Sequence, residues 1–71
     1  MYYDSKKAGN LIKHLREERH LTQEVLSGLA GIARSHLSAI ESGTKSANVE
    51  PLWRITAAIG MKLSVFIQML E

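Results

Sequence analysis

The chain has 71 residues, of which 45% are hydrophobic and 23% charged, so it is long enough for one compact domain with a small core. The absence of cysteine excludes disulfides and thiolate metal ligands, while a formal net charge of +2 and a pI of about 9.2 suit a polyanionic partner without requiring one. No apolar run approaches the roughly 20 residues of a membrane-spanning helix, and the N-terminus is polar where a secretory signal would be apolar. We therefore expect one cytoplasmic domain over residues 1–71, without a membrane segment.

The first predicted element is an amphipathic core helix. Residues 1–4 are expected to form a short arm, and Asp4 or Ser5 to be the N-cap of a helix that runs to about Arg19. The helix is indicated by apolar residues at the spacing i, i+3, i+4 and i+7, namely Ala8, Leu11, Ile12 and Leu15. His20 and Leu21 would connect it to the next helix.

The second predicted helix begins at its cap, Thr22. Its apolar side is expected to consist of Val25, Leu26, Leu29 and Ala30. Gly28 inside this helix costs up to about 1 kcal/mol relative to alanine, so we expect packing against a neighbour or close approach of another backbone to offset it. Gly31 follows at the end, where glycine most easily takes a positive φ and turns the chain.

The third predicted helix runs from about Arg34 to Ser42 and is closed by Gly43. Leu37 and Ile40 face inward at i and i+3. The residues left facing outward are Arg34, Ser35, Ser38, Ala39 and Ser42. Two short helices with a glycine turn between them, over about residues 22–42, indicate a helix-turn-helix, which offers its second helix to a DNA major groove.

Two further helices complete the prediction of five helices without strands. Asn48 would cap the fourth, whose inner stripe is Leu52, Ile55, Thr56 and Ile59. Ser64 would cap a last helix that reaches Leu70 and carries one apolar stripe of Leu63, Phe66, Ile67 and Leu70. Val65 and Met69 form a second stripe that one small core cannot also cover, which implies a partner surface.

From about Ala8 to Leu70 the chain resembles the helix-turn-helix domain of the Cro and phage-repressor superfamily, also called the XRE family. The motifs that carry the resemblance are Leu15-Arg16, Leu21-Thr22-Gln23-Glu24-x-Leu26, Gly31-Ile32, Leu37-x-x-Ile40-Glu41-x-Gly43 and the stretch from Leu52 to Gly60. The resemblance implies an all-α, compact, five-helix lambda-repressor-like DNA-binding domain. Within the family, residues 34–41 look closest to the controller proteins of restriction-modification systems, which are small stand-alone dimers.

Two positions depart from the family pattern. Alanine is usual where Ser27 packs between the two helices, and serine fits if its hydroxyl bonds back to the helix. Ser, Thr or Asp usually caps the recognition helix where this chain has Ala33, so that cap is weaker by about 1 kcal/mol unless a side chain elsewhere replaces it.

Four outward residues of the third helix are the candidate base contacts. Arg34 can lay its planar guanidinium on the N7 and O6 acceptors of a guanine, although it could instead be a solvated arginine or a phosphate clamp. Ser35 and Ser38 are short donors and acceptors, and Ala39 could meet a thymine methyl group. Small residues also suit an ordinary exposed helix.

The candidate contacts to the DNA backbone lie around this helix. Gln23 opens the second helix, whose free N–H groups can receive a phosphate, with a simple capping role as the alternative. His36 would touch the DNA or the flank of the helix. By position in the family, a polar segment after the helix contacts phosphates, the alternative being a mobile loop; its members are Ser42, Thr44, Lys45 and Ser46.

The resemblance also implies a partly buried ion pair between Arg16 and Glu41, tying the first helix to the third. A metal site or a catalytic site is not expected, because the spacings of the three histidines match no ligand motif and no Gly-x-Ser-x-Gly occurs. For Trp53, packing or a place in a dimer interface is favoured over stacking on nucleobases. No cofactor and no small-molecule ligand are predicted.

Together these features predict a sequence-specific, double-stranded DNA-binding transcriptional regulator that acts as a homodimer on a near-palindromic operator. Two recognition helices about 34–36 Å apart would read successive major grooves. The predicted dimer interface is Val65, Phe66, Met69 and Leu70. The alternatives are an antitoxin-type regulator that also binds a partner protein through the last helix, and a protein-protein module that has lost DNA binding.

Overall fold

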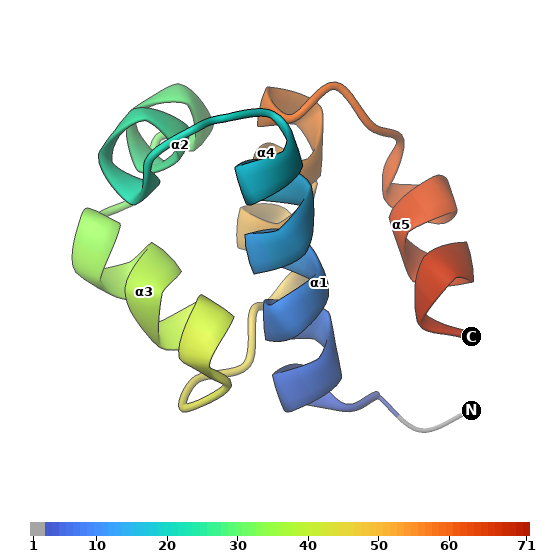
Figure 1. Ribbon diagram of the computed structural model, residues 1–71. Coiled ribbons are helices and arrows are strands. Elements are labelled where there is room, and N and C mark those ends of the chain that lie inside the picture. The colour runs from blue at the N-terminus through green and yellow to red at the C-terminus, as the bar shows by residue number, and fades with distance from the viewer. Residues whose placement is uncertain (1–2) are drawn as a thin grey trace.

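The computed structural model describes residues 3–71, which form five helices and no strand. The helices are α1 (Ser5–Glu18), α2 (Gln23–Ala30), α3 (Arg34–Ser42), α4 (Val49–Ala58) and α5 (Leu63–Leu70). Figure 1 shows α1 in the middle of the molecule, with α2 and α3 on one side, α5 on the other, and α4 behind α1 in this view. The all-α, five-helix fold predicted from the sequence is therefore confirmed.

Side chains cap the first two helices at the predicted residues. Asp4 Oδ1 accepts the backbone N–H groups of Lys6 at 3.0 Å and Lys7 at 3.2 Å. Thr22 Oγ1 accepts the N–H of Val25 at 3.1 Å. Each cap satisfies donors that have no partner inside the helix, so short-range chemistry fixes where α1 and α2 begin.

Glycines end the two helices of the helix-turn-helix, also as predicted. Gly31 closes α2 with a φ of 71°, and Gly43 closes α3 with a φ of 80°. Both values lie in the left-handed region, where a side chain would be strained. These two turns set the direction in which α3 leaves α2 and the direction in which the chain leaves α3.

The starts of the last three helices lack side-chain caps. Ala33 provides none for α3, as expected, and the side chain of Asn48 makes no capping hydrogen bond to α4. The expected cap of α5 at Ser64 is wrong: the Lys62 carbonyl accepts the N–H groups of Val65 and Phe66, so α5 begins earlier. Tertiary packing must therefore hold these three helices in place.

The core gathers residues from all five helices. Its buried members are Ala8, Ile12, Leu15, Leu26, Ala30, Leu37, Ile40, Leu52, Ile55, Ile59 and Phe66. Most of the predicted inner positions are here, but Val25 is 48% and Leu29 63% exposed, because α2 turns only a narrow stripe inward. Trp53 is likewise 62% exposed on α4 and does not pack into the core.

Ser27 is buried, although it is polar. Its hydroxyl donates to the Glu24 carbonyl at 3.0 Å, which is the bond back to the helix that a serine at this position needs.

Two glycines inside helices have opposite surroundings. A Cβ at Gly9 of α1 would overlap the carbonyl oxygen of Ile40 and lie 2.9 Å from that of Glu41, so α1 and α3 approach closely there. A Cβ at Gly28 of α2 would meet nothing within 4 Å. The expected offset for Gly28 is therefore absent from the described part of the chain, while the glycine with a packing role, Gly9, was not recognised in the sequence.

No helix within residues 3–71 has both the length and the apolar character needed to cross a bilayer.

Candidate nucleic-acid interface

The outer face of α3 presents a stripe of polar side chains. Arg34, Ser35 and Ser38 are exposed, and Ser42 continues the stripe one turn further on. These are the predicted outward positions, and the inward ones, Leu37 and Ile40, are buried, so the helix shows one polar face to solvent. The side chains at three of these positions are short, so α3 could fit closely into a DNA major groove, which is about 12 Å wide.

Two other predicted contacts lie to the side of this stripe. Ala39 is half-buried, so less of its methyl group is offered outward than the sequence suggested. His36 is also half-buried and lines a recess with Glu50 and Pro51 at the start of α4. The structure therefore places His36 on the flank of α3, which was one of its two predicted positions.

A buried ion pair holds α3 against α1. Arg16 Nε lies 2.7 Å from Glu41 Oε2, and Arg16 Nη2 donates to Glu41 Oε1 at 3.1 Å. Arg16 Nη1 donates to the carbonyl of Leu21 at 2.7 Å, just before α2. The hydrogen bond with Glu41 raises the pKa of the Arg16 guanidinium above its ordinary value. One guanidinium thus connects α1, α3 and the entry to α2, and the pair implied by the family resemblance lies in ionic contact.

Gln23 joins this network from the first residue of α2. Its Nε2 donates to Glu41 Oε1 at 3.0 Å, which leaves one amide N–H for another acceptor. Gln23 lines a polar recess together with Thr22, Glu24, Arg16 and Arg34, between the N-termini of α2 and α3. The free N–H groups at a helix N-terminus and a held amide donor suit a phosphate oxygen.

The segment after α3 is tied to the carbonyl of Ala39. Ser42 Oγ and Thr44 Oγ1 donate to it at 3.0 and 3.2 Å, and the two hydroxyls lie 3.0 Å apart. The backbone N–H groups of Thr44 and Lys45 point to the same oxygen. One carbonyl oxygen has two lone pairs and cannot fully bond all of these donors, so the two hydroxyls compete with the backbone N–H groups for it. In this segment Lys45 and Ser46 are exposed and keep their side-chain donors for such a contact.

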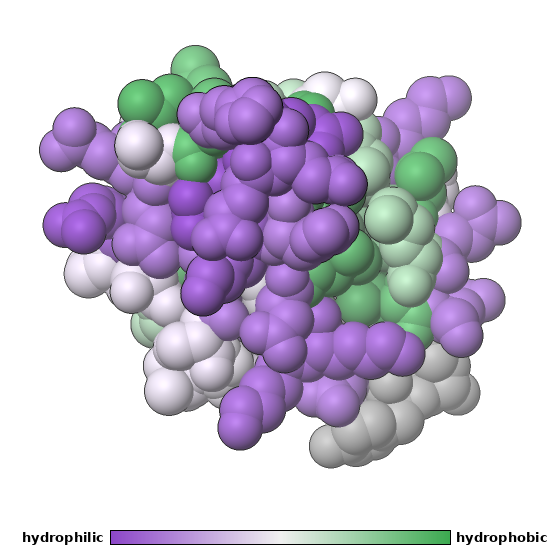
Figure 2. Space-filling view, in the orientation of Figure 1, coloured by the Kyte–Doolittle hydropathy of each residue, from purple (hydrophilic) through white to green (hydrophobic). Residues whose placement is uncertain are grey.

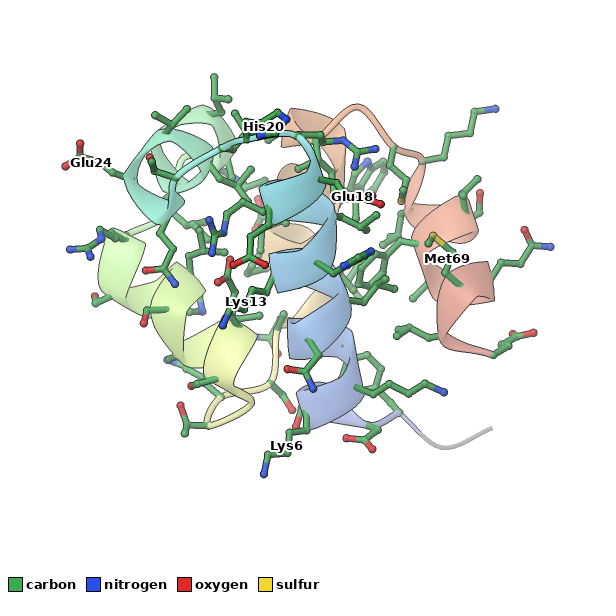
Figure 3. The ribbon with its side chains drawn as sticks, in the orientation of Figure 1. Lys6, Lys13, Glu18, His20, Glu24 and Met69 are labelled. Carbon is green, nitrogen blue, oxygen red and sulfur yellow. The ribbon has the colours of Figure 1, made fainter. Side chains whose placement is uncertain are left out.

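Sequence reasoning missed one residue beside the stripe, Lys13 of α1. It lines a recess with Gln23, Ser38, Glu41 and Ser42, and Figure 3 shows it projecting from α1 toward α3. In the sequence it lies off the apolar stripe of the first helix, which indicates only an exposed position. Its place near α3 could have been inferred from its position three residues before Arg16. Residues three apart on a helix share a face, and Arg16 was expected to reach the third helix.

The predicted dimer surface on α5 is only partly exposed. Val65 is 41% and Met69 48% exposed, Leu70 is half-buried, and Figure 2 shows hydrophobic side chains gathered over α5. Phe66 differs from the expectation, because its side chain is fully buried in the core of its own chain. Phe66 is therefore not accessible to a partner, and the predicted interface is wrong at this residue.

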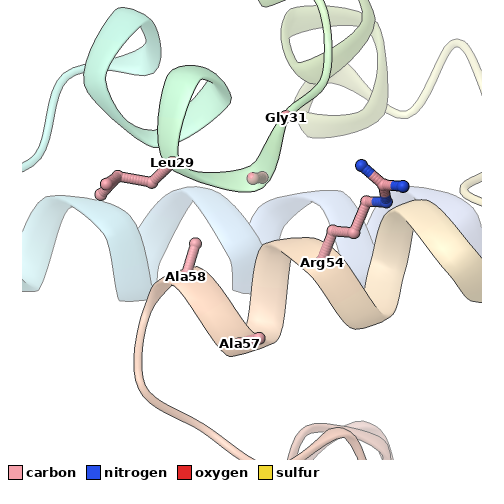
Figure 4. A pocket seen from close by; sticks show the side chains of 6 residues that line it. Leu29, Gly31, Arg54, Ala57 and Ala58 are labelled. Carbon is pink, nitrogen blue, oxygen red and sulfur yellow. The ribbon is translucent and has the colours of Figure 1, made fainter.

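A groove between α2 and α4 lies apart from the polar stripe. Figure 4 shows Leu29 and Gly31 on one side of it and Arg54, Ala57 and Ala58 on the other. The guanidinium of Arg54 is 3.2 Å from a carboxylate oxygen of Glu50, so its charge is already partnered. Within residues 3–71 no group of three histidine or acidic side chains is placed to hold a metal ion.

The fold and this surface define an all-α helix-turn-helix protein. The chain belongs to the helix-turn-helix family, whose profile matches residues 12–66. It is 40% identical over 62 residues to the "ImmF control region 10 kDa protein" of Bacillus phage phi105, covering 87% of this chain and 69% of the relative. It is 35% identical over 57 residues to "Control protein C.MunI" of a Mycoplasma species, covering 79% and 77%.

A solved structure extends the likeness to the whole fold. It is the restriction-modification controller protein C.Esp1396I, as a tetramer in complex with its natural 35 base-pair operator. Its sequence is 27% identical, its TM-score is 0.87, and the match covers 99% of this chain and 92% of the other. The predicted resemblance to the XRE family and to controller proteins is therefore confirmed.

Proposed function

We propose that this protein is a sequence-specific regulator of transcription that binds double-stranded DNA as a homodimer on a near-palindromic operator. The observation that carries the proposal is the exposed polar stripe of α3, which has a recess lined by Gln23 and Arg34 beside its first turn and Lys45 beyond its last. A reading helix bounded by backbone contacts is the arrangement by which a helix-turn-helix enters a major groove.

Reading of bases falls to the first half of α3. Arg34 is exposed at its first turn, where the guanidinium can take guanine N7 and O6 bidentately, and Ser35 and Ser38 can bond to base edges. Ala39 keeps a smaller role, as contact with a thymine methyl group. Gln23, Lys45 and Ser46 hold the phosphates, and Ser42, Thr44 and His36 support the shape of this surface.

Dimerisation is assigned to α5, through Val65, Met69 and Leu70. Two exposed apolar side chains four residues apart make a strip that a symmetric copy can cover. A tetramer of the related controller protein was solved on its operator, which supports assembly of several chains on DNA. A dimer that reads two half-sites one helical turn apart needs its recognition helices about 34–36 Å apart.

The relatives include a phage control-region protein and the control protein C.MunI, and the similar solved structure is that of a restriction-modification controller protein. The role common to these names is control, and regulation by occupancy of an operator is the mechanism we assign. Control of a restriction-modification system is the narrower form of this proposal. We place the protein in the cytoplasm and assign it no catalytic step, cofactor or metal.

Selection of bound duplexes from a random pool, followed by sequencing, tests the proposal. We expect a two-fold symmetric motif, and Arg34→Ala should lose preference at one position of each half-site by about 1–3 kcal/mol. Arg54→Ala is the matched control, because Arg54 is an exposed arginine that lies in the α2–α4 groove. A pool that yields no motif, with an affinity that does not fall as salt rises, would overturn DNA binding.

A further inference from the structure

We propose that α1 supplies a second set of phosphate contacts, made by Lys13 and Lys6, alongside the second half of the recognition helix. This inference rests on the proposed function and adds residues that neither the sequence motifs nor the helix-turn-helix itself contains. The two lysines are seven residues apart on α1, two helical turns and about 10 Å along the axis, so they share one face.

The packing of α1 against α3 brings this face to the DNA side. The absence of a side chain at Gly9 lets α1 reach the carbonyls of Ile40 and Glu41 directly. One turn away on the same side, Lys13 lines a recess with Ser38 and Ser42 of the outer stripe. A phosphate that borders the groove occupied by α3 would therefore face α1 as well.

Lys6 lies at the other end of the contact between α1 and α3, beside the turn that closes α3. A Cβ built on Gly43 would lie 2.7 Å from Lys6 Cγ and 2.9 Å from its Cα, so the stem of Lys6 runs over the turn that closes α3. Lys45 follows two residues after that turn. The C-terminal end of the recognition helix is thus bordered by lysines from two separate segments.

Both ammonium groups are available to an external anion. In the part of the chain that the structure describes, neither lysine forms an ion pair. The carboxylate that lines the recess of Lys13 is Glu41, which already accepts bonds from Arg16 and Gln23. Lys7 shows the contrast, since its Nζ donates to the carbonyl of Leu70 at 3.1 Å at the far end of α5.

The test measures the salt dependence of binding to a fluorescein-labelled duplex that carries the selected motif, and to a scrambled duplex of the same length. Lys13→Gln and Lys6→Gln should each weaken binding several-fold and reduce the slope of log K against log salt by about 0.9 for each phosphate that is no longer neutralised. The loss of affinity should be the same on both duplexes, because phosphate contacts carry no sequence information. The ratio of the two affinities should therefore stay constant.

Lys62→Gln is the matched control, because Lys62 is an exposed lysine at the N-cap of α5, and α5 lies on the side of α1 away from α3 (Figure 1). The inference is overturned if Lys13→Gln and Lys6→Gln change the slope no more than Lys62→Gln does. The proposed function then still stands, provided that the wild-type protein binds the selected motif with a salt slope. A wild-type protein that binds neither duplex would overturn both.

Discussion

Arg16 on α1 and Glu41 on α3 form a buried two-pronged ion pair whose shorter contact is 2.7 Å. The Glu41 side chain is only 3% exposed and the Arg16 side chain 10%, so water screens the charges poorly. Gln23 donates to the same carboxylate from α2. The carboxylate of Glu41 therefore connects α1, α2 and α3, and the geometry of the proposed DNA surface depends on it.

Removing one partner of this pair should be costly. Glu41→Ala leaves the guanidinium of Arg16 buried without a counter-charge, and we expect a loss of about 3–5 kcal/mol in the free energy of unfolding, measured in urea. The double variant Arg16→Met, Glu41→Leu removes both charges and should be clearly more stable than Glu41→Ala. A double variant as unstable as the single one would contradict this account.

The pH dependence of this contribution follows from the raised pKa of Arg16. A raised folded-state pKa adds stability that is fully present below the ordinary pKa of an arginine side chain and is lost only as the pH rises through the folded-state pKa. Titration of Arg16 should therefore leave stability unchanged at every pH below that range. A loss at moderately alkaline pH that disappears in the double variant would contradict it.

Gly9→Ala should separate α1 from α3. The new methyl group would overlap the backbone carbonyl of Ile40, which cannot rotate away as a side chain could. We expect a loss of about 1–3 kcal/mol or more, measured by thermal or urea unfolding, because a close-packed contact must open. If α1 also carries phosphate contacts, affinity for DNA should fall further than the loss of folded protein explains.

Gly28→Ala is the opposite case on a neighbouring helix. A Cβ there meets nothing within 4 Å, and alanine restricts the unfolded chain more than glycine does. We expect a gain of about 0.5–1 kcal/mol in the free energy of unfolding. A loss would show that Gly28 has a contact beyond the described residues, for instance with a partner that needs a bare backbone.

The sequence predicted what depends on short-range chemistry. The caps at Asp4 and Thr22 and the turns at Gly31 and Gly43 follow from the preferences of single residues, and the structure has them where they were expected. Ser64 shows the limit, because a serine near a helix start is a weak signal when backbone carbonyls can begin the helix without it. Local rules therefore gave the order and approximate bounds of the helices.

Features that depend on which helices touch could not be derived in this way. Helical spacing placed Phe66 and Val65 on different faces of the last helix but did not indicate which side chain would be buried in the core. The answer depends on how α5 packs against α1 and α4. The same holds for Gly9, whose role exists only because α3 crosses it. The position of Lys13 beside Ser38 follows from that crossing, so it too required the tertiary structure.

The proposed dimer interface on α5 can be tested against an apolar pair on α2 that is more exposed. Val65→Lys with Met69→Lys places two charges on the strip and should convert a dimer into a monomer, because burying unpaired charges costs several kcal/mol. Val25→Lys with Leu29→Lys makes the same change on exposed positions of α2 and should leave the dimer intact. Sedimentation equilibrium at micromolar concentration distinguishes the two variants. Dissociation of the α2 variant alone would move the interface to α2, and a wild-type monomer that both variants match would remove it.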